Sequence, residues 1–448
     1  MISQKQYQVP CVFCTEEKTG KCITVEVPGS KSITNRALLL ATLAEGKSVL
    51  RGTLFSDDSR HFLNCIQELG FETRVDEGKK IIEVRGLGGD VPKDKASIYV
   101  GSAGTAARFL SAYLGVSRGC YHLDASPQMR RRPMAPLLEC LRQLGCEVEC
   151  QEEEGFFPFT LKANGFGTRH ITVDIGSSSQ FLSALLIAAC LSEEPLEIEV
   201  QGSHGMAYIR MTERMMAQFG VCVEWQGEYN CRIPAGQRYR SLDYRIEPDV
   251  SAACYFYAMA LLLGTEVQVK HVMFDSLQGD VEFLRILERM GAEVREEAEG
   301  IWVSGAPDGH FHGITADMSA CSDQAITLAA LAPFADSPTR ITGIGHIRLQ
   351  ESDRMLAIVT ELRKLGISCE MGEDFIEIQP GIPGPGLVQT YEDHRMAMGF
   401  SLIGLRAPGI VIHDPQCCKK TFENYFETLE NFLEGYVTPI PEDAGKFY

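Results

Sequence analysis

The sequence predicts an α/β protein of two domains, built from six copies of one helix–strand unit. The first observation is length, because 448 residues are too many for a single hydrophobic core and suit two domains. The second is a repeat: five amphipathic helical patterns each end in a glycine, and these glycines lie 71 to 75 residues apart. They are Gly70, Gly145, Gly220, Gly291 and Gly366.

Each of these glycines follows a helical pattern with one apolar face. Leu137, Leu138, Leu141 and Leu144 recur at helical spacing and form a single stripe ahead of Gly145. A glycine at this position stops a helix, because it adopts the left-handed conformation that closes the last turn. The short segment after each glycine has an extended pattern, so we expect a strand there.

A second class of helix recurs in phase with the first, at intervals of 71 to 74 residues. These helices are apolar on almost every side, which predicts that they are buried while the amphipathic helices lie nearer to solvent. Their expected first residues are Ser32, Gly104, Ser178, Asp249, Ser322 and Asp393. The stretch 234–249 separates the third unit from the fourth, and we expect the hinge between two halves of three units there.

Composition and charge exclude several classes of partner. A formal net charge of −18 disfavours binding to nucleic acid or to an anionic membrane surface. No apolar run approaches 18 residues, and the first residues lack the apolar core of a signal peptide. Many of the 16 cysteines lie inside apolar helical patterns, where a reduced thiol packs as a small apolar group. We therefore expect a cytoplasmic monomer with no membrane partner.

The sequence predicts neither a metal ion nor a cofactor. Cys11 and Cys14 have the spacing of a metal-binding pair, but no second pair lies at zinc-finger distance. His310 and His312 would share one face of a strand, but no third ligand is evident, so we interpret them as solvated loop histidines. The sequence also contains no motif for a nucleoside triphosphate, a dinucleotide or a zinc hydrolase.

Basic residues gather at the expected starts of helices. Lys31 precedes the first buried helix, Arg130 to Arg132 precede an amphipathic one, and Arg395 and Lys420 lie at the starts of two further helices. A cation at a helix N-terminus is unfavourable by about 0.3–1 kcal/mol, unless an anion lies between it and the helix dipole. The repeated placement therefore predicts binding sites for small anions such as phosphates.

Two acidic residues stand in the same regions of the sequence. Asp323 follows the expected start of the fifth buried helix, and Glu351 lies just before the fifth amphipathic helix. Acids in a first helical turn are common for stability alone, so the pattern leaves open whether either residue is catalytic. With no cofactor motif, chemistry would rest on acid–base groups and on electrostatic binding of the substrate.

Eight motifs spread along the chain carry a resemblance to a known family. They are SKSITNRALLL, SDDSRHF, GSAGTAARFL, RRRP, SSQFLSALL, ESDRM, DHRMAM and KTFENYF, in this order. By these motifs the chain resembles the enolpyruvyl transferases, and most closely the EPSP synthase family. The resemblance implies six βαβαββ-type repeats, three per domain, with an active site in the cleft between the domains. Residues 1–28 and 247–448 would form one discontinuous domain, and residues 29–246 the other.

The resemblance also implies a reaction: transfer of the enolpyruvyl group of phosphoenolpyruvate to the 5-hydroxyl of shikimate 3-phosphate. The residues that match the phosphoenolpyruvate site are Lys31, Gly104, Arg132, Gln180, Arg354, Arg395 and Lys420. Those that match the shikimate 3-phosphate site are Ser32, Arg36, Ser178, Ser179, Gln180, Tyr208, Asp323 and Gln350. Asp323 would draw the proton from the 5-hydroxyl, and Glu351 with Lys31 would transfer protons at the methylene carbon.

The chain departs from the family pattern at three positions. Gln350 stands where a lysine is usual, Gly205 where a serine is usual, and Ser102 where an asparagine is usual. Gln350 and Gly205 match the side of the site that would bind the acceptor, shikimate 3-phosphate. Each charge-assisted hydrogen bond lost there weakens binding by about 1.5–3 kcal/mol, unless Arg210, Arg348 or His346 compensates. Two alternatives stay open: an enolpyruvyl transferase with a different acceptor alcohol, and a non-catalytic anion-binding paralogue.

Overall fold

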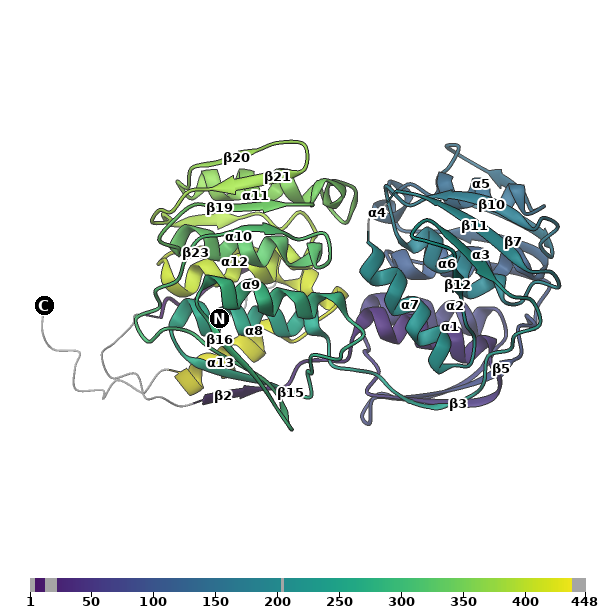
Figure 1. The fold of residues 1–448 in the computed structure, drawn as a ribbon, viewed down its shortest axis with the longest axis horizontal. Helices are drawn as coiled ribbons and strands as arrows, with labels where there is room; N and C mark the ends of the chain where they lie inside the picture. The colour runs from purple at the N-terminus through teal and green to yellow at the C-terminus, as the bar shows by residue number, and fades with distance from the viewer. Residues whose placement is uncertain (1–4, 13–21, 203–204, 437–448) are drawn as a thin grey trace, which may run out of the picture.

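The protein folds into two lobes, which Figure 1 shows side by side. The structure, a computed structural model, describes residues 5–12, 22–202 and 205–436. No helix within these residues is long and apolar enough to cross a membrane. Cys14, one of the two cysteines at metal-like spacing, lies outside the described residues, and Cys11 is a free thiol.

The first lobe is built from residues 31–245, which follow one another in three units. Its helices and strands are α1 (Lys31–Leu43), β3 (Glu45–Arg51), α2 (Asp57–Glu68), β4 (Glu72–Asp76), β5 (Ile81–Leu87), β6 (Lys95–Tyr99), α3 (Gly104–Val116), β7 (Arg118–Asp124), α4 (Pro127–Arg130), α5 (Ala135–Gln143), β8 (Glu147–Cys150), β9 (Phe159–Asn164), β10 (His170–Asp174), α6 (Gln180–Ala189), β11 (Leu196–Gln201), α7 (Met206–Gln218), β12 (Glu224–Trp225), β13 (Asn230–Ile233) and β14 (Asp243–Arg245).

The second lobe combines the N-terminal strands with the rest of the chain. Its elements are β1 (Gln6–Gln8), β2 (Cys22–Val25), α8 (Val250–Leu263), β15 (Glu266–Lys270), η1 (Gly279–Glu282), α9 (Phe283–Met290), β16 (Glu293–Glu297), β17 (Gly300–Ser304), β18 (Thr315–Asp317), η2 (Ser322–Gln324), α10 (Ala325–Leu331), η3 (Ala332–Phe334), β19 (Thr339–Thr342), η4 (Gly345–Leu349), α11 (Arg354–Lys364), β20 (Cys369–Met371), β21 (Phe375–Ile378), β22 (Gly386–Val388), α12 (His394–Arg406), β23 (Ile410–His413), η5 (Pro415–Lys420) and α13 (Tyr425–Tyr436).

The unit predicted from the sequence is confirmed, and each unit contributes one sheet. One sheet, for example, has the strand order β6–β7–β9–β8. Its strands β6 and β7 pair in parallel and are connected by the buried helix α3, and β9 and β8 add antiparallel strands. The same order recurs in the sheets β10–β11–β13–β12 and β18–β19–β21–β20. The chain is therefore an α/β protein of βαβαββ repeats, as expected.

Two strands are exchanged between the lobes. Strand β2 precedes α1 in the sequence but pairs in parallel with β15, while β14 precedes α8 but pairs in parallel with β3. Figure 1 shows β2, in purple, lying in the lobe that the C-terminal part of the chain forms. The two chain segments that cross between the lobes lie side by side. The N–H of Ser30 donates to the carbonyl of Glu247, and the N–H of Asp249 donates to the carbonyl of Pro28, both at 2.8 Å.

Each lobe has its own core around three buried helices. Thirteen of the fourteen residues of α8 are buried, because all but Ser251 lack a charged or strongly polar side chain. Helices α1, α3 and α6 fill one core, and helices α8, α10 and α12 fill the other. Five of these six helices begin within two residues of the positions expected from the sequence. The exception is α10, because the 3₁₀ helix η2 precedes it. The exact domain boundaries stay a prediction.

Candidate active site

The first turns of helices from both lobes meet at one cleft. It encloses about 950 Å³, open solvent at its mouth included. All but one of the residues that the sequence proposed for the site line it: Lys31, Ser32, Arg36, Gly104, Arg132, Ser178, Ser179, Gln180, Tyr208, Asp323, Gln350, Glu351, Arg354 and Arg395. The exception is Lys420, which lies behind the wall with its Nζ atom 3.4 Å from Glu351 Oε1.

Arg354 is the centre of the charged network in the cleft. Its Nε atom lies 2.8 Å from Asp393 Oδ2, its Nη1 2.9 Å from Asp323 Oδ1, and its Nη2 2.8 Å from Glu351 Oε2. Its Nη1 also donates to the side-chain oxygen of Gln350. One buried guanidinium therefore connects both acids that the sequence singled out, and an anion that enters the cleft must compete with them.

The carboxylate of Asp323 is held charged by its neighbours. Burial by itself would raise its pKa, but Arg395, 2.7 Å from Oδ2, and Arg354 outweigh burial and lower the pKa to about 2. The hydroxyl of Tyr208 donates a further hydrogen bond to Oδ2 at 2.7 Å. A group this acidic is a weak base, so its basicity rises only when its cationic partners turn to another anion.

Glu351 is charged for a similar reason. Burial would raise its pKa, but Lys420, Arg354, Arg132 and Lys31 together hold it well below the usual value. These four cations converge on it from both lobes and from four separate parts of the sequence. Lys31 in turn lies 3.6 Å from Asp58, whose other oxygen accepts a 3.4 Å hydrogen bond from Ser102.

Two buried donors beside Gly104 have no acceptor among the described residues. They are Arg132 Nε and Arg108 Nε, and the side-chain oxygen of Gln180 is likewise without a donor. A buried charge without a hydrogen-bonding partner is costly, so such a cluster is typical of a site that binds a ligand of opposite charge. Gly104 leaves the space, since a Cβ there would lie 2.9 Å from both Arg108 Nη1 and Arg132 Nη1.

The opposite side of the cleft is formed by Arg36 and the serines before α6. Arg36 is fully buried and donates through Nε to Thr212 at 2.7 Å, and burial lowers its pKa to about 10, so it remains charged at neutral pH. Gly205 has a left-handed φ of 68°, and a Cβ there would lie 2.6 Å from the side chain of Ser179. A serine at position 205 would therefore collide with Ser179 in this arrangement.

None of the three residues considered as a replacement for the usual lysine supplies a free charge. Arg210 pairs with Glu213 at 2.8 Å and lies over the ring of Trp225. Arg348 donates to the carbonyl of Gly372 at 2.9 Å. His346 does line the cleft, but burial lowers its pKa to about 4, so its ring is neutral at pH 7.

The structure adds site residues that the sequence reasoning missed. Arg108 lines the cleft four residues after Gly104 on the same face of α3, and that spacing is the signal that could have found it. Asp58 stands inside one of the eight motifs but was given no role. Asp280 does not line this cleft; it lies behind Asp323, where it accepts hydrogen bonds from Ser251 at 2.9 Å and Gln324 at 3.0 Å.

The two histidines that the sequence analysis assigned to a loop do lie in an exposed loop. They are not on a strand, however, because β17 ends at Ser304 and β18 begins at Thr315. A third group of the ligand type is present, since Asp336 lies beside both rings. The sequence gave no sign of it because 24 residues separate it from His312.

Comparison with known proteins places this site in a family. The family model described as EPSP synthase (3-phosphoshikimate 1-carboxyvinyltransferase) matches residues 21–429. The chain belongs to the EPSP synthase family. A relative from Nostoc punctiforme, named 3-phosphoshikimate 1-carboxyvinyltransferase, is 44% identical over 92% of this chain and 96% of its own length. A relative of the same name from Shewanella loihica is 41% identical over 90% and 95%.

Members of the family also share the fold. The solved structure of EPSP synthase from Acinetobacter baumannii superposes with a TM-score of 0.77, covering 95% of this chain and 98% of that one. Its sequence identity to this chain is 24%, so this likeness supports the architecture alone. Together with the sheets and the two cores, it confirms the two-lobed fold expected from the motifs.

Proposed function

We propose that this chain transfers the enolpyruvyl group of phosphoenolpyruvate to the 5-hydroxyl of shikimate 3-phosphate and releases inorganic phosphate. Family membership and the names of the relatives support this reaction. The observation that carries it is the pair of buried guanidinium groups beside Gly104, Arg108 and Arg132, each with an Nε atom that has no acceptor among the described residues, because such a cluster favours an anion. Phosphoenolpyruvate supplies one, with a phosphate and a carboxylate on a small carbon frame.

Phosphoenolpyruvate would lie against the first turn of α3. Its phosphate would accept from Lys31, Arg132, Gln180 and Lys420, with Gly104 leaving room for its oxygens. Its carboxylate would be held by Arg354 and Arg395, whose guanidinium groups now bind Asp323. Binding would therefore draw both arginines away from Asp323 and raise the pKa of that carboxylate towards a value suited to a base.

Shikimate 3-phosphate would occupy the side formed by α1, the loop before α6, and α7. Ser178, Ser179 and Gln180 would receive its phosphate, and Ser32 with Arg36 the rest of the molecule. Tyr208 and Gln350 would contact it at the edges, and Asp323 would face its 5-hydroxyl. This side carries the changes at Gly205 and Gln350, so the affinity for shikimate 3-phosphate is the quantity that an experiment should measure first.

The chemistry then follows from two acids and several fixed cations. Asp323 accepts the proton of the 5-hydroxyl while the oxygen bonds to C2 of phosphoenolpyruvate, and a proton from Lys31 adds to the methylene carbon, with the charged Glu351 placed to accept a proton back in the second step. The product is a tetrahedral intermediate. Loss of a proton from the new methyl group and cleavage of the bond to the phosphate oxygen give the enol ether and inorganic phosphate.

The test is release of phosphate from phosphoenolpyruvate, measured with and without shikimate 3-phosphate. We expect release that depends on the acceptor and falls about 10²- to 10⁴-fold in Asp323→Asn and Glu351→Gln. Release that depends on a different alcohol would favour the alternative acceptor. Binding of both substrates with no turnover in any form, together with unchanged affinity in Glu351→Ala, would favour the non-catalytic paralogue.

A further inference from the structure

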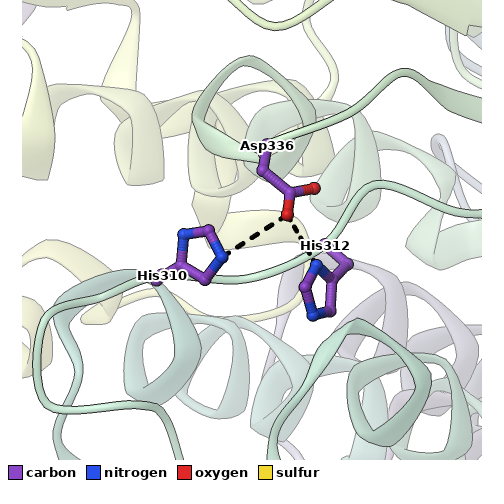
Figure 2. A group of neighbouring side chains, drawn as sticks. All are labelled: His310, His312 and Asp336. Atoms are coloured by element: carbon purple, nitrogen blue, oxygen red, sulfur yellow. Dashed lines mark hydrogen bonds and ion pairs between the residues drawn. The ribbon is translucent and has the colours of Figure 1, made fainter.

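A compact group of three polar side chains lies in the second lobe, outside the cleft (Figure 2). His310 Nε2 is 3.4 Å from Asp336 Oδ2, and His312 Nδ1 is 2.6 Å from the same oxygen. All three ligand-type atoms lie within 4.8 Å of one another. Within residues 5–12, 22–202 and 205–436, these are the residues whose donor atoms come together in this way.

The backbone around the group is fixed at several points. Phe311, between the two histidines, is buried, and its carbonyl accepts from the N–H of Asp336 at 3.1 Å. The N–H of His312 donates to the carbonyl of Met290 at 2.9 Å. Ser337 donates to Asp336 Oδ1 at 2.7 Å, which leaves Oδ2 directed at the imidazoles. The two loops are thus held in place independently of any contact between the three side chains.

The spacing suits a tetrahedral metal ion. Bonds of about 2.1 Å at tetrahedral angles separate neighbouring ligand atoms by about 3.4 Å. The pair His310–Asp336 already has this separation, and the pair His312–Asp336 must open by less than about 1 Å, a change that exposed side chains can make by rotation. Two imidazoles and one carboxylate form a donor set that zinc and neighbouring divalent ions prefer.

The group lies at the end of the lobe opposite the cleft. Helix α8 starts beside the cleft, where its Ser251 accepts from the cleft residue Arg395 at 3.3 Å, and it ends at Leu263. Arg406, at the end of α12, donates to the carbonyl of Gly309 in the histidine loop at 2.8 Å. A helix of the length of α8 spans about 21 Å, so an ion here would not touch the substrates. The net charge of −18 favours the approach of a cation.

We propose that His310, His312 and Asp336 form a structural site for a divalent transition metal ion, of which zinc is the best fit. The ion would join the loop between β17 and β18 to the turn between η3 and β19. Those segments belong to the fourth and fifth units, so the ion would tie one repeat to the next. Exposure leaves room for water to complete the coordination.

Binding is tested on the whole chain, freed of metal by a chelator and kept reduced. Titration with Co²⁺ should give visible bands of nitrogen and oxygen ligation with a stoichiometry of one, and no thiolate charge-transfer band. Titration with Zn²⁺ should displace the Co²⁺ and raise the midpoint of thermal unfolding. The variants His310→Gln and His312→Gln should each weaken binding at least about tenfold and lose the thermal shift.

His170→Gln is the matched control, because His170 is an exposed histidine on β10, in the other lobe. It should bind Co²⁺ as the unchanged chain does, and phosphate release should be equal in all these forms. Equal Co²⁺ affinity in the unchanged chain and in both histidine variants would overturn the proposal. So would cobalt spectra dominated by a thiolate band, because these would place the ion at cysteines.

Discussion

The hydroxyl of Tyr208 donates a 2.7 Å hydrogen bond to Asp323 Oδ2, and this bond joins the two lobes across the cleft. Tyr208 stands in the first turn of α7, and Asp323 in the 3₁₀ turn ahead of α10. The same carboxylate is the one that the proposed reaction needs as a base. Tyr208 therefore acts on both the closure of the lobes and the acidity of Asp323.

Replacing Tyr208 with phenylalanine should test this double role. A hydrogen bond to a charged group contributes about 1.5–3 kcal/mol, so we expect the KM for shikimate 3-phosphate to rise roughly 10- to 100-fold. Loss of the donor should also raise the pKa of Asp323 and shift the acid limb of the kcat/KM profile to higher pH. Tyr244→Phe, which removes a surface contact to Gln218, is the control. An unchanged acid limb would contradict the role in acidity.

Gly104→Ala should affect phosphoenolpyruvate and leave the acceptor largely unaffected. The new methyl group would lie 2.9 Å from the Nη1 atoms of Arg108 and Arg132 and 3.2 Å from Gln180 Oε1. Overpacking of this size costs about 1–3 kcal/mol, so the KM for phosphoenolpyruvate should rise about 5- to 150-fold. Initial rates with each substrate varied in turn measure this. An equal rise in both KM values would show that the two substrates do not divide the cleft as proposed.

Gln350→Lys should strengthen binding of shikimate 3-phosphate. The new ammonium cannot accept from Arg354 as the amide does, and repulsion should turn it towards the cleft. One charge-assisted contact to the phosphate would lower the KM for shikimate 3-phosphate about tenfold or more. Gln350→Met removes the same amide without adding charge and should raise that KM or leave it unchanged. If both variants behave alike, the phosphate does not lie beside position 350.

Asp280 should make stability depend on pH in the mildly acidic range. Burial raises its pKa from 3.8 to about 6, and the nearby charge of Asp323 adds to this, while Arg395 opposes it. The folded state therefore binds the proton more tightly than the unfolded state. Its stabilising contribution is complete below about pH 4 and is lost as the pH rises through 6.

The comparison of unchanged protein with Asp280→Asn isolates this effect, because asparagine resembles the protonated acid and does not titrate. We expect the urea midpoint of the unchanged protein, relative to that of the variant, to fall between about pH 4 and pH 7. A constant difference across this range would mean that Asp280 keeps the same charge in both states.

The sequence was a good guide wherever a feature is local. The closing glycines and the apolar helices repeat at a fixed spacing, and each depends only on residues within one helix, so both predictions were confirmed. The exchange of β2 and β14 is different. Either strand would fit either sheet by its own pattern, and only the path of the chain between the lobes decides the pairing.

The functional regions show the same contrast between features that are local in the sequence and features that depend on the fold. Lys31, Asp323 and Glu351 were found because they stand in motifs, and their meeting in the cleft needed the fold. Asp336 could not be connected with His310 and His312, because the β18 strand and the buried helix α10 intervene in the sequence. The sequence also did not predict that three carboxylates bind Arg354, since one of them, Asp393, comes from the next unit.

The exchanged strand β2 has a consequence for how the chain is made. Residues 31–245 can complete their sheets as they leave the ribosome, since β14 arrives last and closes the sheet of β3. Strand β2 must wait for β15, some 240 residues later, which takes roughly 10–50 s at usual rates of translation. Strand β2 is thus synthesised before the whole first lobe but pairs only after it, and its unpaired edge is a part of the nascent chain that a chaperone would have reason to cover.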